Sequence, residues 1–186
     1  MPNMENFNTE LELTYLATCI PAEVQEVTPE HLLDVYIPEN PDMHSHLRLR
    51  QRGDKYEITK KVPIKEGDPS AQIEYNIPLD AKEFTSLSLV SNKRIEKDRY
   101  DINIEGNPAE VDIFMGALKG LVLIDFEFSS DVDKQTFTPP SCCLVEVTEE
   151  NFIAGGNLAG KSYNELANDL ARFNYRPLQC PPTTLL

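Results

Sequence analysis

The sequence predicts a mainly β (α+β) fold, in which antiparallel strands are joined by turns and a few short helices. Polar and apolar residues alternate with a period of two along most of the chain, whereas helical periodicity is confined to the C-terminal part and two short connectors. The 186 residues, of which 40% are hydrophobic and 26% charged, suffice for one domain with a buried core.

The first half of the chain is expected to consist of strands. Pro38 is expected to end the strand that begins near Leu32, and Pro78 the strand that begins near Gln72. Gly53-Asp54 is expected to form the turn of a hairpin between the strands on either side of it. The five candidate strands cover residues 10–15, 32–37, 47–50, 56–61 and 72–77.

The second half mixes strands with helices. Asp80 is a candidate N-cap for a helix over residues 81–90, and a residue among Ser129, Ser130 and Asp131 is expected to cap another that reaches Phe137. Further strands are expected at 94–104, 110–114 and 121–128, with a turn at 106–108, and a last amphipathic helix at 162–173.

The charge balance narrows the classes of partner. The 31 acidic residues against 17 basic ones give a net charge of −14, which disfavours binding to nucleic acid or to an anionic membrane. No stretch approaches the roughly 20 apolar residues of a membrane helix, and the first residues lack a secretory pattern, so we expect a cytoplasmic protein. The four cysteines lack zinc-site spacing and are expected to stay reduced.

Charges of one sign gather within single strands. Residues two apart on a strand project to the same side, so such pairs repel unless something compensates them. In a closed barrel with a polar interior, acidic strands would hold divalent cations and basic strands would bind a polyanion. Alternation alone leaves open whether this face lines a tunnel or meets water. The pairs are Glu10/Glu12, Arg48/Arg50, Lys97/Arg99, Glu110/Asp112 and Asp125/Glu127.

Several short blocks, in order, resemble the CYTH or triphosphate tunnel metalloenzyme family. The family's ExExK motif corresponds to ELELT at residues 10–14, and the similarity extends to about Thr148. Each block alone is a weak signal, but their order is that of the family. The later blocks are HLRLRQRGDKYEITKK, QIEY, KRIEKDRY, EVDIFMG, LVLIDFEF and VEVT.

The resemblance implies an eight-stranded antiparallel closed β-barrel, or tunnel, with peripheral helices. We assign residues 1–176 to this domain and expect the proline- and threonine-rich tail, 177–186, to be loosely ordered. The implied function is metal-dependent hydrolysis of a small-molecule triphosphate, either inorganic tripolyphosphate or an organic or nucleoside triphosphate, with Mg²⁺ or Mn²⁺ as cofactor.

The resemblance also implies roles for individual residues. Glu12, Glu127 and Asp112 correspond to catalytic carboxylates. Lys61 is preferred to Lys60 because it shares a strand face with Glu57 and Thr59. The implied metal ligands are Glu10, Glu12 and Glu127, with Glu74, Glu110, Asp112 and Asp125 as second-metal or water ligands, and the implied phosphate-binding residues are Arg48, Arg50, Lys61, Lys97 and Arg99.

Two segments depart from the family pattern. Thr14 stands where the family has lysine, so a catalytically weakened polyphosphate- or nucleotide-binding protein is an alternative. A barrel whose acidic surface binds protein partners, with no ligand inside, is a third possibility. The glycine-rich segment from Asn151 to Gly156 is expected to be a loop, with a lid as the alternative. GGNLAGKS formally matches a phosphate-binding loop, but no buried strand is expected before it. The preferred triphosphate and the oligomeric state stay open.

Overall fold

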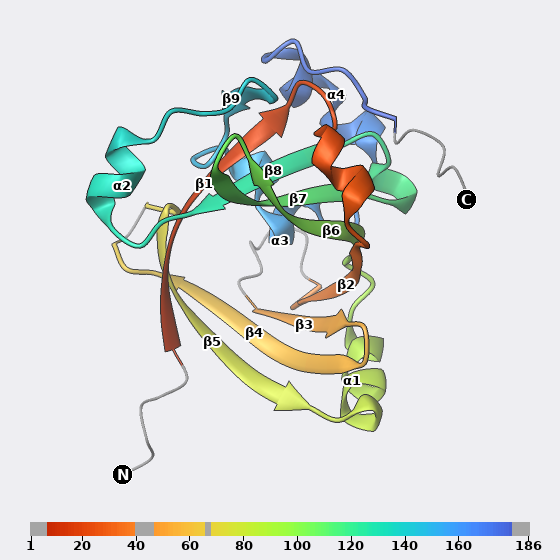
Figure 1. The fold of residues 1–186 in the computed structure, drawn as a ribbon. Coiled ribbons are helices and arrows are strands. Elements are labelled where there is room, and N and C mark those ends of the chain that lie inside the picture. Colours follow the sequence, from red (N-terminus) through yellow and green to blue (C-terminus); the bar gives the residue numbers. More distant parts are fainter. Residues whose placement is uncertain (1–6, 40–46, 66–67, 180–186) are drawn as a thin grey trace.

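The computed structural model describes residues 7–39, 47–65 and 68–179, and the side chains of residues 7–10 are outside this description. Within these residues nine strands form one antiparallel sheet (Figure 1). The strands are β1 (Phe7–Ala17), β2 (Glu30–Ile37), β3 (Leu47–Arg52), β4 (Lys55–Pro63), β5 (Ala71–Leu79), β6 (Arg94–Ile104), β7 (Asn107–Phe114), β8 (Val122–Glu127) and β9 (Cys143–Glu146).

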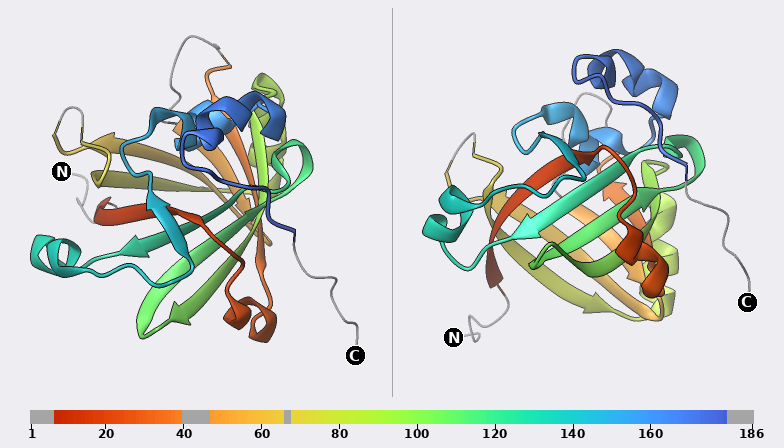
Figure 2. Two further views of the ribbon diagram at one scale, coloured as in Figure 1. Left: turned by 90° about the horizontal axis from the view of Figure 1, so that it is seen from above. Right: turned by 45° about the horizontal axis from the view of Figure 1, so that its top comes forward.

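Eight of the strands close into a barrel, as the resemblance implied. They follow the order β5-β4-β3-β2-β6-β7-β8-β1, and β1 returns to β5 with Phe7 opposite Tyr75 and Leu11 opposite Ala71. Beyond this contact β1 pairs with β9, where Tyr15 lies opposite Glu146. Figure 2 shows the strands wrapping around a common axis. The ninth strand therefore extends the sheet without belonging to the closed ring.

The helices lie outside the ring or at its end. Asp80 caps α1 and shares a capping box with Glu83, and the side chain of Ser130 caps α2. The helices are α1 (Ala81–Leu87), α2 (Asp131–Thr136), α3 (Gly155–Leu158) and α4 (Tyr163–Ala171), and the 3₁₀ turns are η1 (Ala22–Glu26), η2 (Ser88–Val90), η3 (Gly116–Leu118) and η4 (Asn151–Ile153).

The apolar core surrounds the barrel more than it fills it. Val111, Ile124 and Phe126 pack on the outer side of β7 and β8, while Val35, Leu49 and Phe84 pack where α1 covers β2 and β3. A third cluster places Leu166 and Leu170 of α4 against inward-facing side chains at one end of the ring. The remaining interior is thereby left to polar and charged side chains.

Two predicted boundaries are wrong. β5 continues through Pro78, which lies opposite Glu57 of β4. Among the described residues β1 accompanies β5 only as far as Tyr75, so Pro78 needs no second ladder partner. The β6–β7 turn consists of Glu105 and Gly106, both with positive φ, instead of residues 106–108. This two-residue turn lets Asn107 and Pro108 begin β7.

The described part of the tail is in contact with the domain. The backbone N–H of Leu178 donates to the carbonyl oxygen of Gly120 at 2.9 Å. Residues 180–186 lie outside the described residues, so the loosely ordered tail stays a prediction. Cys19, Cys142 and Cys143 are free thiols, and Cys180 lies outside the description. No helix in the described ranges has the length and apolar character needed to span a membrane.

Candidate functional site

A cavity of about 510 Å³ lies inside the barrel, and its wall collects the charged strand faces. Eleven of the twelve predicted site residues line it; the exception is Glu10, whose side chain is outside the description although its backbone lies opposite Gln72. The eleven are Glu12, Arg48, Arg50, Lys61, Glu74, Lys97, Arg99, Glu110, Asp112, Asp125 and Glu127. The segregated charges therefore converge on one cavity, and the roles of the individual residues stay predictions.

Sequence reasoning missed several polar residues of the cavity. Asp34 lies between apolar neighbours in β2, and Arg52 and Glu57 lie on either side of the β3–β4 turn. Counting these and Glu150, which pairs with Arg172 outside the wall, the cavity wall has nine carboxylate side chains against six arginine or lysine side chains. A polyanion entering this cavity would therefore need cations to accompany it.

Asp34 and Arg50 form a buried ion pair between neighbouring strands. Arg50 Nε donates to Asp34 Oδ1 at 2.8 Å, and Arg50 Nη2 donates to Oδ2 at 2.7 Å. Burial alone would raise the pKa of Asp34, but the charges of Arg50 and Arg48 outweigh it and hold this pKa well below its usual range. This bidentate contact fixes the orientation of the Arg50 guanidinium.

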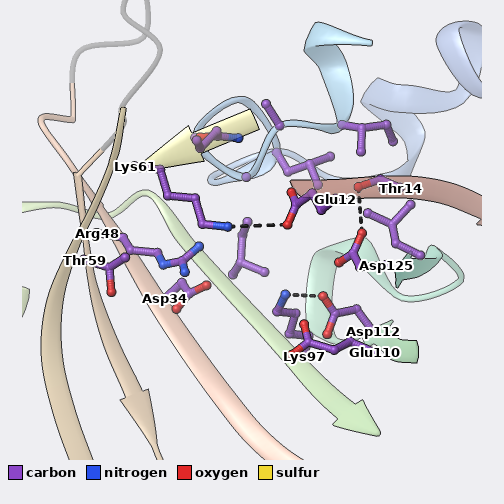
Figure 3. Close-up of a pocket in the computed structure, with 18 of the residues that line it drawn as sticks. Glu12, Thr14, Asp34, Arg48, Thr59, Lys61, Lys97, Glu110, Asp112 and Asp125 are labelled. Atoms are coloured by element: carbon purple, nitrogen blue, oxygen red, sulfur yellow. Dashed lines mark hydrogen bonds and ion pairs between the residues drawn. The ribbon is translucent and has the colours of Figure 1, made fainter. Parts of the chain in front are cut away.

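Arg48 lies two residues before Arg50 and points into the same cavity (Figure 3). Its Nη2 lies 3.7 Å from Glu74 Oε2. Its Nε is buried and has no hydrogen-bond partner in the described part of the chain. A buried N–H of this kind is costly unless an acceptor arrives, which a bound oxyanion would supply.

Lys61 connects the basic strands with the acidic ones. Its Nζ lies 3.6 Å from Glu12 Oε2 and 3.7 Å from Glu74 Oε2, and Figure 3 shows it reaching toward Glu12. Asn76 Nδ2 donates to Glu74 Oε1 at 2.7 Å. Burial favours the neutral form of Glu74, but Lys61 and the Asn76 hydrogen bond lower its pKa. Lys61, and not the exposed Lys60, therefore faces the cavity, as strand alternation predicts.

Arg99 is the centre of a second charge network. Its Nε and Nη2 each donate to an oxygen of Asp112 at 2.7 Å, it contacts Glu110, and its Nη2 lies 3.7 Å from Asp125 Oδ2. Lys97 also contacts Asp112. These two cations outweigh burial and hold the pKa of Asp112 well below its usual range. Burial, with the nearby charge of Arg99, lowers the pKa of Lys97 to about 8.

Thr14, at the position of the motif lysine, points to a carboxyl group. Its hydroxyl donates to Asp125 Oδ1 at 2.7 Å (Figure 3). Its backbone N–H donates to the hydroxyl of Thr148 at 3.0 Å. Burial, followed by the negative charges of Glu12 and Asp112, raises the pKa of Asp125 to about 7. The site therefore holds a carboxyl group that takes up a proton near neutral pH.

The acidic wall comes from β1, β7 and β8. Glu12 lies opposite Glu127, and Glu110 lies opposite Asp125, so carboxylates face one another across strands. Carboxylate oxygens are the ligands that Mg²⁺ and Mn²⁺ prefer. The donor chemistry of this wall therefore fits a hard cation. Even so, no three Asp, Glu, His or Cys side chains of the described ranges converge closely enough to hold a metal ion.

One end of the cavity is apolar and closed by the C-terminal segment. Ile153, Leu158 and Val147 line it together with Phe114 and Leu123. The expected loop at residues 151–156 is instead the 3₁₀ turn η4 followed by the start of α3. A Cβ atom on Gly155 would lie 2.7 Å from Cζ of Tyr36, so only glycine fits here without a shift.

The Gly-Lys-Ser sequence at residues 160–162 is not a phosphate-binding loop. Both the backbone N–H and the hydroxyl of Ser162 donate to Glu165 Oε2, at 2.8 and 2.7 Å. A carboxylate therefore already occupies the N-terminus of α4, and the residues before it form a short helix instead of a buried strand.

A closed barrel with an acidic and a basic wall defines a class of tunnel proteins suited to polyanions. Comparison with known proteins supports this assignment. The chain is 36% identical over 144 residues to an inorganic triphosphatase of Nitrosomonas europaea, covering 76% of this chain and 91% of that protein. It is 30% identical over 122 residues to an inorganic triphosphatase of Acetivibrio thermocellus, covering 66% and 76%. A solved inorganic triphosphatase structure matches with a TM-score of 0.60 and 31% identity, over 81% of this chain and 93% of that one.

No protein-family profile matches the chain. The identity and coverage of the two relatives nevertheless show where it belongs. The chain is a member of the CYTH, or triphosphate tunnel metalloenzyme, family.

Proposed function

We propose that this protein is a hydrolase that cleaves a triphosphate inside its barrel with the help of a divalent cation. The observation that carries the proposal is the convergence of a basic wall and an acidic wall on one cavity. Both curated relatives described above are named inorganic triphosphatases, which favours inorganic tripolyphosphate over a nucleoside triphosphate as the substrate.

The basic wall would bind and align the phosphate chain. Arg48 offers a buried Nε without an acceptor, and Arg50 offers a guanidinium whose orientation Asp34 fixes. Lys61, Lys97 and Arg99 would add positive charge at the boundary with the acidic wall. Holding the phosphate chain in line with an attacking water is the main contribution a protein makes to phosphoryl transfer.

The acidic wall would hold Mg²⁺ or Mn²⁺ through carboxylate oxygens. Glu12, Glu127 and Glu10, which lies two residues before Glu12, are the proposed main ligands. Candidates for a second ion or for water are Glu74, Glu110, Asp112 and Asp125. A bound divalent cation supplies charge neutralisation to the phosphate oxygens and lowers the pKa of bound water. The excess of carboxylates over basic side chains in the cavity wall supports the binding of such cations with the polyanion.

The proposed catalytic carboxylates have different surroundings. Glu12 and Glu127 face each other across β1 and β8, where they would orient the attacking water. Asp112 is fully engaged by Arg99 and Lys97, so it would act by keeping these two cations in position. Two of the proposed catalytic carboxylates would therefore act on the water, and the third would hold cations of the basic wall in position.

A binding protein with little turnover is the second candidate, and Thr14 is the observation that favours it. Without the motif lysine the site loses one charge-assisted contact to phosphate, on the order of 1.5–3 kcal/mol. Binding of tripolyphosphate with Mn²⁺ without phosphate release would favour this alternative.

Release of inorganic phosphate from tripolyphosphate, with Mg²⁺ or Mn²⁺, tests the proposal. We expect release that Glu12→Gln nearly abolishes, while Glu149→Gln, the same change at an exposed residue, leaves it intact. Absence of release from any triphosphate at high protein concentration would refute hydrolysis. The cytoplasmic location and the particular metal stay predictions.

A further inference from the structure

We infer that the protein couples its two ligands by an exchange of ion-pair partners: the divalent cation and the phosphate chain each release the side chains that the other needs. The inference rests on the proposed function and concerns how the two ligands depend on each other. In the structure the candidate metal carboxylates contact the candidate phosphate-binding cations.

The first group of such pairs surrounds Arg99. This one guanidinium contacts the carboxylates of Asp112, Glu110 and Asp125, which come from β7 and β8. Its side chain is only 11% exposed, and that of Asp112 is 2% exposed. Turning Arg99 to a phosphate oxygen would therefore weaken its contacts with these carboxylates, of which Asp112 also contacts Lys97. A metal ion bound by Glu110 or Asp125 would in turn cost Arg99 one of its partners.

The second group surrounds Lys61, on the opposite side of the cavity. Its ammonium group lies between Glu12 and Glu74, at 3.6 and 3.7 Å. Glu12 is a proposed main metal ligand, and Lys61 is a proposed phosphate ligand. These distances are long for ion pairs, so the contacts are of a kind that stronger ligands replace readily.

Breaking a buried ion pair by removing one partner is costly because it leaves an uncompensated charge. A metal ion alone would displace cations that then have no acceptor, and a phosphate alone would displace carboxylates that then have no cation. When both ligands bind, every displaced group finds a new partner. The two binding events are therefore cooperative, and the coupling is reciprocal by thermodynamic linkage.

The pairing of Arg50 sets a limit to the exchange. Its carboxylate partner, Asp34, lies on β2 among the basic strands and is not a candidate metal ligand. Arg48, in contrast, contacts the candidate metal ligand Glu74 at 3.7 Å, so it joins Lys61, Lys97 and Arg99 among the cations whose partners can exchange.

Calorimetric titration of the full chain with Mn²⁺, in the absence and presence of inorganic phosphate, tests the inference. Inorganic phosphate serves as the probe because it chelates Mn²⁺ only weakly in solution. We expect saturating phosphate to tighten Mn²⁺ binding at least about fivefold, within the usual range of allosteric coupling, and Mn²⁺ to tighten phosphate binding by the same factor.

Removing a basic side chain from the network is expected to change Mn²⁺ affinity in a second, different way. In Lys61→Met and Arg99→Met we expect Mn²⁺ alone to bind several-fold more tightly than in the unchanged protein, with little further gain from phosphate. Arg52→Met is the matched control, since Arg52 lines the same cavity but pairs with Glu30 and Asp101. The side chain of Lys61 is 23% exposed, so we expect Lys61→Met to fold. This variant can therefore be tested even if Arg99→Met does not fold.

Equal Mn²⁺ affinity with and without phosphate would overturn the coupling while leaving triphosphate hydrolysis intact. An equal gain of Mn²⁺ affinity in Arg52→Met would also overturn it, because the effect would then come from cavity charge and not from partner exchange. Loss of all binding, combined with absence of phosphate release, would refute the proposed function as well.

Discussion

The hydroxyl of Thr14 donates a 2.7 Å hydrogen bond to Asp125 Oδ1 across β1 and β8. This contact occupies the place where the family's motif has a lysine beside the acidic wall. Burial, with the negative charges of Glu12 and Asp112, raises the pKa of Asp125 to about 7, and the uncharged Thr14 adds no positive charge beside it. We therefore expect the residue at position 14 to influence phosphate binding.

Thr14→Lys is expected to raise kcat/KM for tripolyphosphate. The added ammonium group would pair with Asp125 and offer a charge-assisted contact to phosphate, on the order of 1.5–3 kcal/mol, or roughly 10- to 150-fold. Steady-state kinetics with Mn²⁺ measure the effect. Thr14→Val, which removes the hydroxyl without adding charge, is the control, and a lysine variant no faster than the valine variant would contradict the expectation.

Asp34→Asn is expected to lower stability most at neutral pH. The pKa of Asp34 is lower in the folded protein than its unfolded value of about 3.9, so its stabilising effect is complete above that value and is lost as the pH falls. Breaking this buried pair costs about 3 kcal/mol. Urea unfolding at pH 7 and at pH 3 measures the difference, which should shrink at the lower pH. A gap of constant size would contradict the ion-pair account.

Gly155→Ala is expected to destabilise the closed end of the cavity. The new methyl group would lie 2.7 Å from Cζ of Tyr36, so the ring or α3 must shift, at a cost of about 1–3 kcal/mol. Thermal unfolding measures this cost. Because the tyrosine hydroxyl is the group nearest the new methyl, the cost should be smaller in a Tyr36→Phe background. An equal cost in both backgrounds would place the strain elsewhere.

Ligand-induced stabilisation is expected to need both ligands. The cavity has more carboxylates than cations, so tripolyphosphate without Mn²⁺ should raise the melting temperature little, whereas the pair should raise it clearly. A thermal-shift series with tripolyphosphate, Mn²⁺ and their combination checks this. A full shift by tripolyphosphate alone, in the presence of a chelator, would contradict the charge balance.

Strand faces could be read from the sequence because alternation with a period of two fixes which side chains share a side. This is why Lys61 could be distinguished from Lys60, and why Glu12 and Arg50 were placed on polar faces. Closure of the sheet was not derivable from alternation, and it came from the order of motifs. The turn at Glu105 and Gly106 was misplaced because two neighbouring turn formers, Asn107 and Pro108, follow it.

The partners across strands could not be predicted in the same way. Asp34 sits between apolar neighbours, and only the register of β2 with β3 places it opposite Arg50. The engagement of Asp112 by Arg99 likewise depends on the register of β6 with β7. The closed apolar end depends on Ile153 and Leu158, which join the barrel from far along the chain. The sequence of a strand indicates which side chains share a face, whereas the contacts between strands far apart in the sequence depend on their register.

Phosphorus NMR of tripolyphosphate incubated with Mg²⁺ and a stoichiometric amount of the protein tests the central claim most directly. We predict that the tripolyphosphate resonances give way to those of orthophosphate and pyrophosphate, and that Glu12→Gln prevents the change. Resonances that persist unshifted and unbroadened over hours would contradict both hydrolysis and binding in the charged cavity.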